Sequence, residues 1–440
     1  MMLRLLRLLR CGFPLAAIFH GALATAQYSL GLNDPTNVWD APVPGFVGPD
    51  GVGKARLDDG FGGFYHARNF VNPIFFGWAQ SATDYVRADG QTAYSDVSLA
   101  LGPVTGDYMD VVSLGDLSAA QLAASAPVGK ITLHLTDALH PAPLRDLPGA
   151  DFVVFENAVS TSRGVFGELA YVEVSSDGIH FARFPSVSLT SGPPGPYGSI
   201  DPTKVFNLAG KHVNNTELGV GDCWGTPFDL AALANDPLVT AGTLDLANVR
   251  HIRIVDIPGN GSFFDSATPI PHPIYDPWLT QGSGGFDLEA VGAISVAMTF
   301  DEWQDFHGLT GPQRGPLADP DGDGVPNIIE CAFAMQPLIP DAEKLPQPAS
   351  TGTDFAISFR RDTRALNLTV EVLAASALGQ PWQVIARSTA GGPLLAVGSF
   401  SPVIEDSSDS PIASIGVIRR ERVHAIAGKK FLKIAVTLAP

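Results

Sequence analysis

The sequence predicts a mainly β protein: a large N-terminal β-sandwich, a short helical junction and a small C-terminal β-sandwich. Three observations predict this order. Residues 28–298 contain short alternating or continuous apolar runs separated by Gly, Pro, Asn and Asp, which is typical of an all-β domain. From Thr299 the apolar residues take helical spacing, and beyond residue 352 the alternating runs return.

The first 26 residues are typical of a secretory signal peptide. Arg4, Arg7 and Arg10 precede an apolar run over residues 13–23, and small residues follow at 24–26. The run is too short to span roughly 30 Å of hydrocarbon, and no later segment has the roughly 18 uninterrupted apolar residues that a span needs. We therefore expect an exported protein, secreted or held at the cell surface, with no transmembrane segment in the mature chain.

The charge and the cysteines exclude two further classes. The formal net charge of -18 becomes -21 when the three signal-peptide arginines are removed, which argues against nucleic acid and anionic lipid as partners. Such acidity suits divalent cations. Only Cys223 and Cys331 remain in the mature chain, so it is no disulfide scaffold, and both a single bridge and two free thiols stay open.

The N-terminal sandwich is predicted over residues 27–298. Its strands are expected in "KITLHL" (130–135), "DFVVFE" (151–156), "LAYVEVSSDG" (169–178), "VRHIRIVDI" (249–257) and "FDLEAVGAISVAM" (286–298). Gly178 can adopt a positive φ and so close a hairpin. Two long tracts rich in Gly and Pro, residues 191–201 and 258–285, are expected as loops, and loops of that length are often functional.

The helical junction is predicted over residues 299–336. Thr299 or Asp301 can cap a first helix that ends at Gly308, and "NIIECAFAM" can form a second. Residues 337–352 are rich in proline and predict a linker, and residues 353–440 carry the alternating strands of a C-terminal β domain.

An acidic stretch, "DPDGDGVPNIIE", lies between the two predicted helices. Calcium prefers about six to eight oxygen ligands, and the twelve-residue EF-hand loop supplies them from its first, third, fifth, seventh, ninth and twelfth positions. The matching residues are Asp319, Asp321, Asp323, Val325 through its carbonyl, Asn327 and Glu330. We predict calcium as the cofactor; the alternative is a solvated acidic turn.

The arrangement of this loop favours a structural role for calcium. Pro326 has no N–H, so the β-bridge that couples paired EF-hands cannot form in the usual way, which predicts a solitary hand. All the ligand positions are occupied by protein groups, so no coordination position is left open for chemistry. A solitary hand between two β domains is suited to bracing their junction.

No motif for nucleophilic, zinc or phosphoryl chemistry occurs in the sequence. A glycoside hydrolase needs only two carboxylates, and seven lie on or beside predicted strands: Asp151, Glu156, Glu168, Glu173, Asp256, Asp287 and Glu289. Glu156 with Asp287 could instead hold a second calcium at the sandwich edge. The simplest interpretation is that most of the seven face solvent.

Several stretches resemble a large group of exported bacterial cell-surface proteins. They include "NPIFFGWAQSATDY", "ADFVVFENA", "FGELAYVEVSSDGIHFARFPSVSL", "VRHIRIVDI" and "IYDPWLTQGSGGFDLEAVGAI", within residues 60–295. In that group "VEVSSDG" and "GGFDLEAV" resemble strands of a galactose-binding, discoidin-like jelly roll. The resemblance implies a jelly-roll sandwich and a binding module rather than an enzyme.

The C-terminal third, from "FDEW" through "DPDGDGVPNIIECAF" to "KFLKIAVTL", is similar to a tail found on exported proteins of the Verrucomicrobia. In those proteins a calcium loop of the thrombospondin or dockerin type precedes a small β domain. The terminal hydrophobic anchor of sorting-tail relatives has no counterpart in this sequence.

Together these observations favour a non-catalytic, calcium-stabilised binding or cell-envelope protein whose N-terminal loops recognise a glycan. Tyr197, Trp224, Tyr275 and Trp278 are the candidate ligand-binding residues, because sugar faces stack on aromatic rings. The same rings could instead anchor loops. One alternative is an extracellular glycoside hydrolase or polysaccharide lyase that uses a carboxylate pair; another is a structural envelope or matrix protein.

Overall fold

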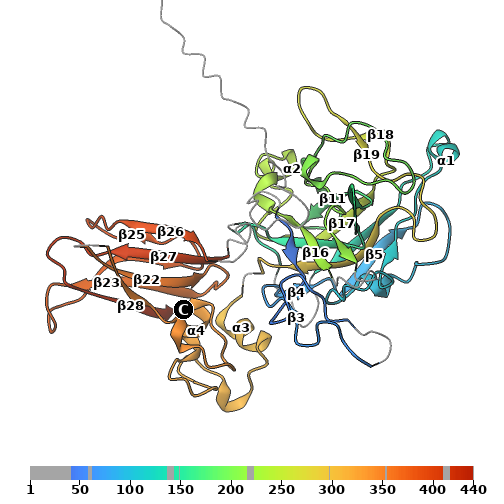
Figure 1. Ribbon diagram of the computed structural model, residues 1–440. Coiled ribbons are helices and arrows are strands. Elements are labelled where there is room, and N and C mark those ends of the chain that lie inside the picture. Colours follow the sequence, from blue (N-terminus) through green and yellow to red (C-terminus); the bar gives the residue numbers. More distant parts are fainter. Residues whose placement is uncertain are drawn as a thin grey trace, which may run out of the picture.

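The computed structural model describes residues 41–57, 62–135, 143–147, 149–215, 222–296, 298–351, 354–409 and 417–439. It consists of a larger N-terminal β body and a smaller C-terminal β body, with helices between them (Figure 1). The predicted mainly β fold is confirmed. The signal peptide predicted at residues 1–26 lies outside the described residues. No helix in the described ranges is long and apolar enough to cross a membrane.

The N-terminal body is an antiparallel sandwich of two main sheets. One sheet has the order β1 (Val43–Pro44), β16 (Asp222–Phe228), β8 (Phe152–Glu156), β20 (Asp287–Ala293), β4 (Gly77–Trp78), with β15 (Asn214–Asn215) paired to β16 and β6 (Val112–Ser113) paired to β20. The other has the order β12 (Ala182–Arg183), β11 (Ala170–Ser175), β17 (His251–Asp256), β7 (Lys130–His134), β5 (Ser81–Val86). Neighbouring strands are mostly distant in sequence, as in a jelly roll.

Smaller elements border this sandwich. They are the pairs β2 (Phe46–Val47) with β3 (Phe70–Val71), β9 (Val159–Thr161) with β10 (Gly164–Phe166), β13 (Val187–Ser188) with β14 (Val205–Phe206) and β18 (Asn260–Phe264) with β19 (Pro273–Tyr275), the helices α1 (Ala119–Ala123) and α2 (Pro237–Thr240), and the 3₁₀ turns η1 (Val97–Ala100), η2 (Pro202–Lys204) and η3 (Leu230–Leu233).

The core lies between the two main sheets. Phe152 and Val154 of β8 share one buried cluster with Val172 of β11 and Ile254 of β17. The opposite face of β8 is buried as well, because Phe155 packs in a second cluster with residues of the first strands. The five predicted strands are confirmed to within a few residues, and Gly178, with a φ of 75°, closes the expected β11–β12 hairpin.

The C-terminal body consists of two four-stranded antiparallel sheets. Their orders are β21 (Gln347–Thr351), β22 (Asp354–Asp362), β27 (Ile418–His424), β26 (Ile404–Ser408), and β25 (Leu395–Ala396), β24 (Gln383–Thr389), β23 (Leu368–Ala375), β28 (Phe431–Leu438). The expected linker over residues 337–352 therefore contains the first strand of this body. The prolines of this segment suggested a linker. Pro348 instead lies in β21, an edge strand, where a residue without an N–H is tolerated.

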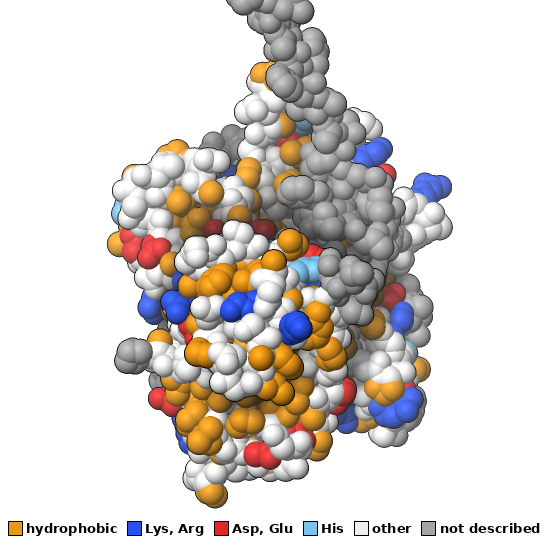
Figure 2. All heavy atoms as spheres, turned by 90° about the vertical axis from the view of Figure 1, so that its left-hand side faces the viewer, with side chains coloured by type: hydrophobic (Ala, Val, Ile, Leu, Met, Phe, Trp, Pro, Cys, Tyr) orange, Lys and Arg blue, Asp and Glu red, His pale blue; other side chains and the backbone are white. Residues whose placement is uncertain are grey.

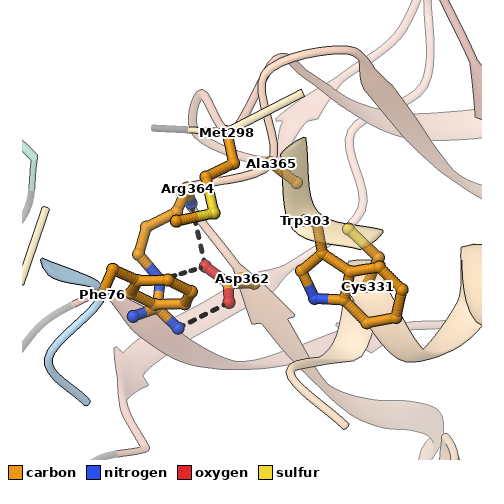
Figure 3. Close-up of a pocket in the computed structure, with 7 residues that line it drawn as sticks. All are labelled: Phe76, Met298, Trp303, Cys331, Asp362, Arg364 and Ala365. Atoms are coloured by element: carbon orange, nitrogen blue, oxygen red, sulfur yellow. Dashed lines mark hydrogen bonds and ion pairs between the residues drawn. The ribbon is translucent and has the colours of Figure 1, made fainter. Parts of the chain in front are cut away.

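The junction between the bodies carries α3 (Phe300–Phe306), η4 (Gly311–Gln313), α4 (Asn327–Phe333) and η5 (Ala342–Lys344). Backbone hydrogen bonds tie the junction to the C-terminal body: the Met298 N–H donates to the Arg364 carbonyl at 2.8 Å, and the Leu366 N–H donates to the Met298 carbonyl at 2.7 Å. The Arg364 guanidinium carbon lies 3.6 Å from the ring centroid of Phe76, a residue of the N-terminal body (Figure 3). The two bodies are thus in direct contact.

Candidate metal centre

The acidic loop precedes α4, as predicted. Helix α3 begins at a capping box, in which the Thr299 hydroxyl accepts from the Glu302 N–H and the Glu302 carboxylate accepts from the Thr299 N–H. Both predicted helices are therefore present. Unlike the entering helix of an EF-hand, α3 does not run into the loop: Gly308 and Gly311 have positive φ, and residues 307–318 separate the two.

Three aspartates shape the loop by accepting backbone hydrogen bonds. Asp319 accepts from the N–H groups of Gly322 and Gly324, at 2.9 and 3.0 Å. Asp321 accepts from Asp323, and one oxygen of Asp323 accepts from the Val325 N–H at 2.8 Å. These bonds turn the backbone so that the three side chains converge.

The converging carboxylates form two overlapping groups. One oxygen from each of Asp319, Asp321 and Asp323 lies within 4.8 Å of the others, and the same holds for Asp323, Glu330 and Asp341. Asp323 belongs to both groups, so the two groups adjoin one another at this residue.

The polar atoms around this space lack partners in the protein. Five buried oxygens of the site, in the described part of the chain, accept no hydrogen bond: Asp321 Oδ2, Asn327 Oδ1, Glu330 Oε1, Glu330 Oε2 and Asp341 Oδ1. A buried acceptor without a partner costs about 1–3 kcal/mol, and more when it is charged. A cation bound among these residues would provide a partner for such oxygens.

The acidic groups also repel one another. Burial, followed by the negative charges of Asp321, Asp323, Asp341 and Asp319, raises the pKa of Glu330 to about 8. Every candidate ligand is an oxygen, which suits a hard cation such as calcium and not a metal that prefers nitrogen or sulfur. The residues therefore fit calcium.

The two remaining predicted ligands are placed consistently. The Asn327 side-chain amide donates to the carbonyls of Gln313 and Gly315, at 2.8 and 3.1 Å, which leaves its oxygen as the end available to a cation. The side chain of Val325 is buried in the main core. Its packing there fixes the position of the Val325 backbone carbonyl.

Asp341 is a candidate ligand that the sequence prediction missed. Its N–H donates to Asp323 at 2.9 Å, and its Oδ2 accepts from the Lys344 ammonium at 2.6 Å. The only sequence signal was an acidic residue in a segment taken for a linker. Asp341 joins the acidic loop to the chain that enters the C-terminal body.

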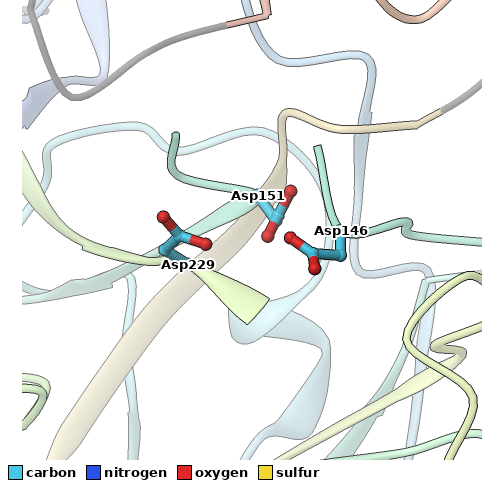
Figure 4. A group of neighbouring side chains, drawn as sticks. All are labelled: Asp146, Asp151 and Asp229. Carbon is cyan, nitrogen blue, oxygen red and sulfur yellow. The ribbon is translucent and has the colours of Figure 1, made fainter. Parts of the chain in front are cut away.

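A third acidic group, Asp146, Asp151 and Asp229, is a loop anchor instead (Figure 4). Asp151 is fully buried, and its two oxygens accept from the N–H groups of Leu147 and Leu230, at 3.0 and 2.7 Å. Asp229 accepts from the Ala231 N–H. Because Asp151 is satisfied by the backbone, this group does not need a cation.

The expectation that the strand carboxylates face solvent is wrong. All seven are buried: Asp151, Glu156, Glu168, Glu173, Asp256, Asp287 and Glu289. Most of them hold loops by accepting backbone N–H bonds, as Glu168 does from Gly285 and Asp256 does from Phe286. Such long loops carry N–H groups that no strand pairs, and a carboxylate accepts them well.

Glu156 and Asp287, the candidates for a second calcium, lie on neighbouring strands. Glu156 pairs with Leu288 in the β8–β20 register, so Asp287 starts from the opposite face of the sheet. Each has one buried oxygen without a partner. Neither belongs to a close group of three metal ligands among the described residues, and this second site stays a prediction.

The buried carboxylates predict a stability that falls as the pH rises. Burial raises the pKa of Glu289 to about 7, although the bonds from Asn214 and the Thr105 segment lower it. The folded state therefore retains a proton that the unfolded state releases, and this stability is lost between about pH 4.5 and 7. We expect urea unfolding in EDTA to show this loss, and Glu289→Gln to reduce it. An unchanged pH slope in the variant would contradict the assignment.

The four candidate ligand-binding aromatics do not form one exposed surface. Trp224 is buried against Gly53, where a Cβ would lie 2.1 Å from the indole. The Trp278 indole N–H donates to the Leu117 carbonyl at 3.0 Å, and the Tyr275 ring packs on Gly261. Only Tyr197 is largely exposed, at 86%. Three of the four rings thus anchor loops, the alternative that the sequence left open.

Cys223 and Cys331 are both buried and free, so no bridge joins them. No protein-family model matches the chain, and no curated protein matches it.

Proposed function

We propose that the protein is an exported, calcium-stabilised, non-catalytic binding or cell-envelope protein that recognises glycans. The observation that carries this proposal is the oxygen-lined loop of the junction, with its five unpartnered buried oxygens. Calcium would offset the negative charge of these carboxylates. Asp319, Asp321, Asp323, Asn327 and Glu330 would hold it, with the Val325 carbonyl, and Asp341 would tie it to the C-terminal body.

The burial of the carboxylates supports binding rather than hydrolysis. A glycosidase needs two carboxyl groups that reach the substrate from a cleft. Asp151, Glu168, Asp256 and Glu289 are instead buried and committed to backbone N–H groups. The hydrolase or lyase alternative is therefore the weaker one.

The structural envelope or matrix alternative is favoured by exposed apolar side chains of the C-terminal body. The C-terminal body exposes large apolar side chains, among them Leu378 (74%), Leu395 (61%) and Val403 (62%). Figure 2, which views the molecule from the left-hand side of Figure 1, shows hydrophobic side chains interspersed with Lys and Arg on this face. Sedimentation velocity over a concentration series separates self-association from glycan binding.

The test uses the chain from residue 27 with insoluble envelope and plant polysaccharides, in calcium. We expect the protein to sediment with at least one polysaccharide and to release no reducing sugar or unsaturated product from it. Release that is lost when two of the strand carboxylates become amides would establish the hydrolase or lyase instead. The absence of both binding and release would leave the structural alternative.

A further inference from the structure

A cleft of about 310 Å³ lies where the two β bodies meet. Four segments distant in sequence line it: residues 72–76 of the N-terminal body, α3, the chain after α4, and β22 with its neighbours. A second hollow of about 320 Å³ adjoins it and shares Lys344, Arg360 and Asp409 with it. Small-molecule sites have about this volume and often lie at domain boundaries. We call the two hollows together the junction cleft.

One wall of the junction cleft is apolar. Phe76 and Phe306 are in contact with ring centroids 4.7 Å apart, and Ile74, Met335 and Ile418 extend this wall. Figure 3 shows Phe76 and Trp303 on either side of the adjoining ion pair of Asp362 and Arg364. The Phe76 N–H donates to the Ala293 carbonyl at 2.9 Å, which fixes the backbone of this residue to β20.

The charged groups that line the cleft are fixed by their own ion pairs. Arg364 donates through two nitrogens to Asp362, at 2.9 and 2.7 Å. Arg360 lies 2.7 Å from Asp409, which also pairs with Arg420. Groups held in this way lose little side-chain entropy when a ligand binds.

His307 adds a neutral polar group. Burial, followed by the charge of Arg364, lowers the pKa of His307 to about 4, so the ring is uncharged near pH 7. One ring nitrogen then donates and the other accepts. The cleft therefore offers donors and acceptors side by side.

The charges of the junction cleft nearly cancel. Lys344, Arg360, Arg364 and Arg420 oppose Glu343, Asp362 and Asp409, and Lys344 is also paired with Asp341. A neutral sugar presents an apolar face and hydroxyl groups that both donate and accept, which matches a cleft lined by apolar side chains together with donors and acceptors. We propose that the junction cleft binds an oligosaccharide of neutral sugars; this rests on the proposed glycan recognition and relocates it from the N-terminal loops.

The calcium loop lies directly behind one side of this cleft. Lys344 lines both hollows, and its ammonium is held at 2.6 Å by Asp341, a candidate calcium ligand. The Gln336 N–H, from another residue of the lining, also donates to Asp341. Removal of calcium should therefore loosen this side of the cleft and weaken sugar binding.

The experiment screens the chain from residue 27 on an array of neutral and uronic-acid-containing oligosaccharides, in calcium. The tightest neutral oligosaccharide is then titrated by calorimetry into Arg360→Ala and Lys344→Ala. We expect each variant to bind roughly tenfold more weakly or worse, because a hydrogen bond from a charged group is lost. The matched control is Arg387→Ala, which breaks the Arg387–Glu371 pair elsewhere on the same body and should leave affinity unchanged.

The outcomes distinguish a failure of the proposed binding site from a failure of glycan recognition itself. If Arg360→Ala and Lys344→Ala leave binding intact and Tyr197→Ala abolishes it, the sugar does not bind in the cleft. Glycan recognition would then belong to the N-terminal loops. Binding confined to acidic oligosaccharides would overturn the ligand class. No binding to any oligosaccharide or polysaccharide would overturn both proposals. Melting curves identify a variant that fails to fold. In that case the affinity of the other cleft variant decides whether the sugar binds in the cleft.

Discussion

We expect calcium to raise the melting temperature of the metal-stripped protein, and the combined substitution Asp321→Ala and Glu330→Ala to abolish the rise. Without a cation the folded state keeps the unpartnered oxygens of both residues buried among other carboxylates. A cation that binds only the folded state adds about 2.7 kcal/mol at a free concentration one hundred times its Kd. Scanning calorimetry over a calcium titration measures the shift.

The control for this experiment is Glu343→Gln, an exposed acidic residue near the site that should keep the full shift. Asp341→Asn should keep part of it, because the other carboxylates remain. Two results would contradict the calcium site: no shift in the unmodified protein, or a shift that the double variant retains. The second would place the cation elsewhere and direct attention to Glu156 and Asp287.

The shape of the acidic loop could be predicted because its determinants are local. Asp319 and Asp321 accept from backbone N–H groups no more than five residues away, as does one oxygen of Asp323, and Glu330 returns to them on α4. The same holds for the strands and for the β11–β12 hairpin, whose turn needs only Gly178. Alternation and turn residues within a short window contain this information.

Asp341 and the junction cleft could not be predicted in this way. Asp341 reaches the loop because α4 ends at Ala334, which adopts a left-handed conformation, and the chain then folds back. The cleft depends on how four distant segments meet. Local sequence patterns do not predict such contacts, because they depend on packing between residues that are distant in sequence.

The strand carboxylates show a different limit. A pattern of single acidic residues between apolar ones is typical of a half-exposed strand, and solvent exposure was the natural expectation for Asp151 or Glu289. Both faces of the central sheet are covered, however, so these residues are buried and accept N–H groups from loops. Whether the second face of a sheet is covered is a property of the whole fold.

The second large effect is expected in the C-terminal body, where Arg361 and Glu421 form a buried ion pair. Their side chains are 3% and 1% exposed, Arg361 Nε donates to Glu421 at 2.9 Å, and a terminal nitrogen of Arg361 donates to the Gly391 carbonyl. Arg361→Met should lower the free energy of unfolding by about 3–5 kcal/mol, because it leaves a buried carboxylate without its cation.

The double variant distinguishes a broken pair from lost packing. Arg361→Met with Glu421→Leu removes both charges, and we expect it to recover most of the stability, since an apolar pair of similar volume replaces the ion pair without an uncompensated charge. Breaking the more exposed Arg387–Glu371 pair by Arg387→Ala should cost only about 0–1 kcal/mol. Urea unfolding followed by intrinsic tryptophan fluorescence, to which Trp382 of this body contributes, measures all three variants. Two results would contradict this explanation: a loss of unfolding free energy in Arg361→Met no larger than that in Arg387→Ala, or a double variant that is the least stable of the three. Either result would mean that the side chains of the pair contribute through packing and not through their buried charges.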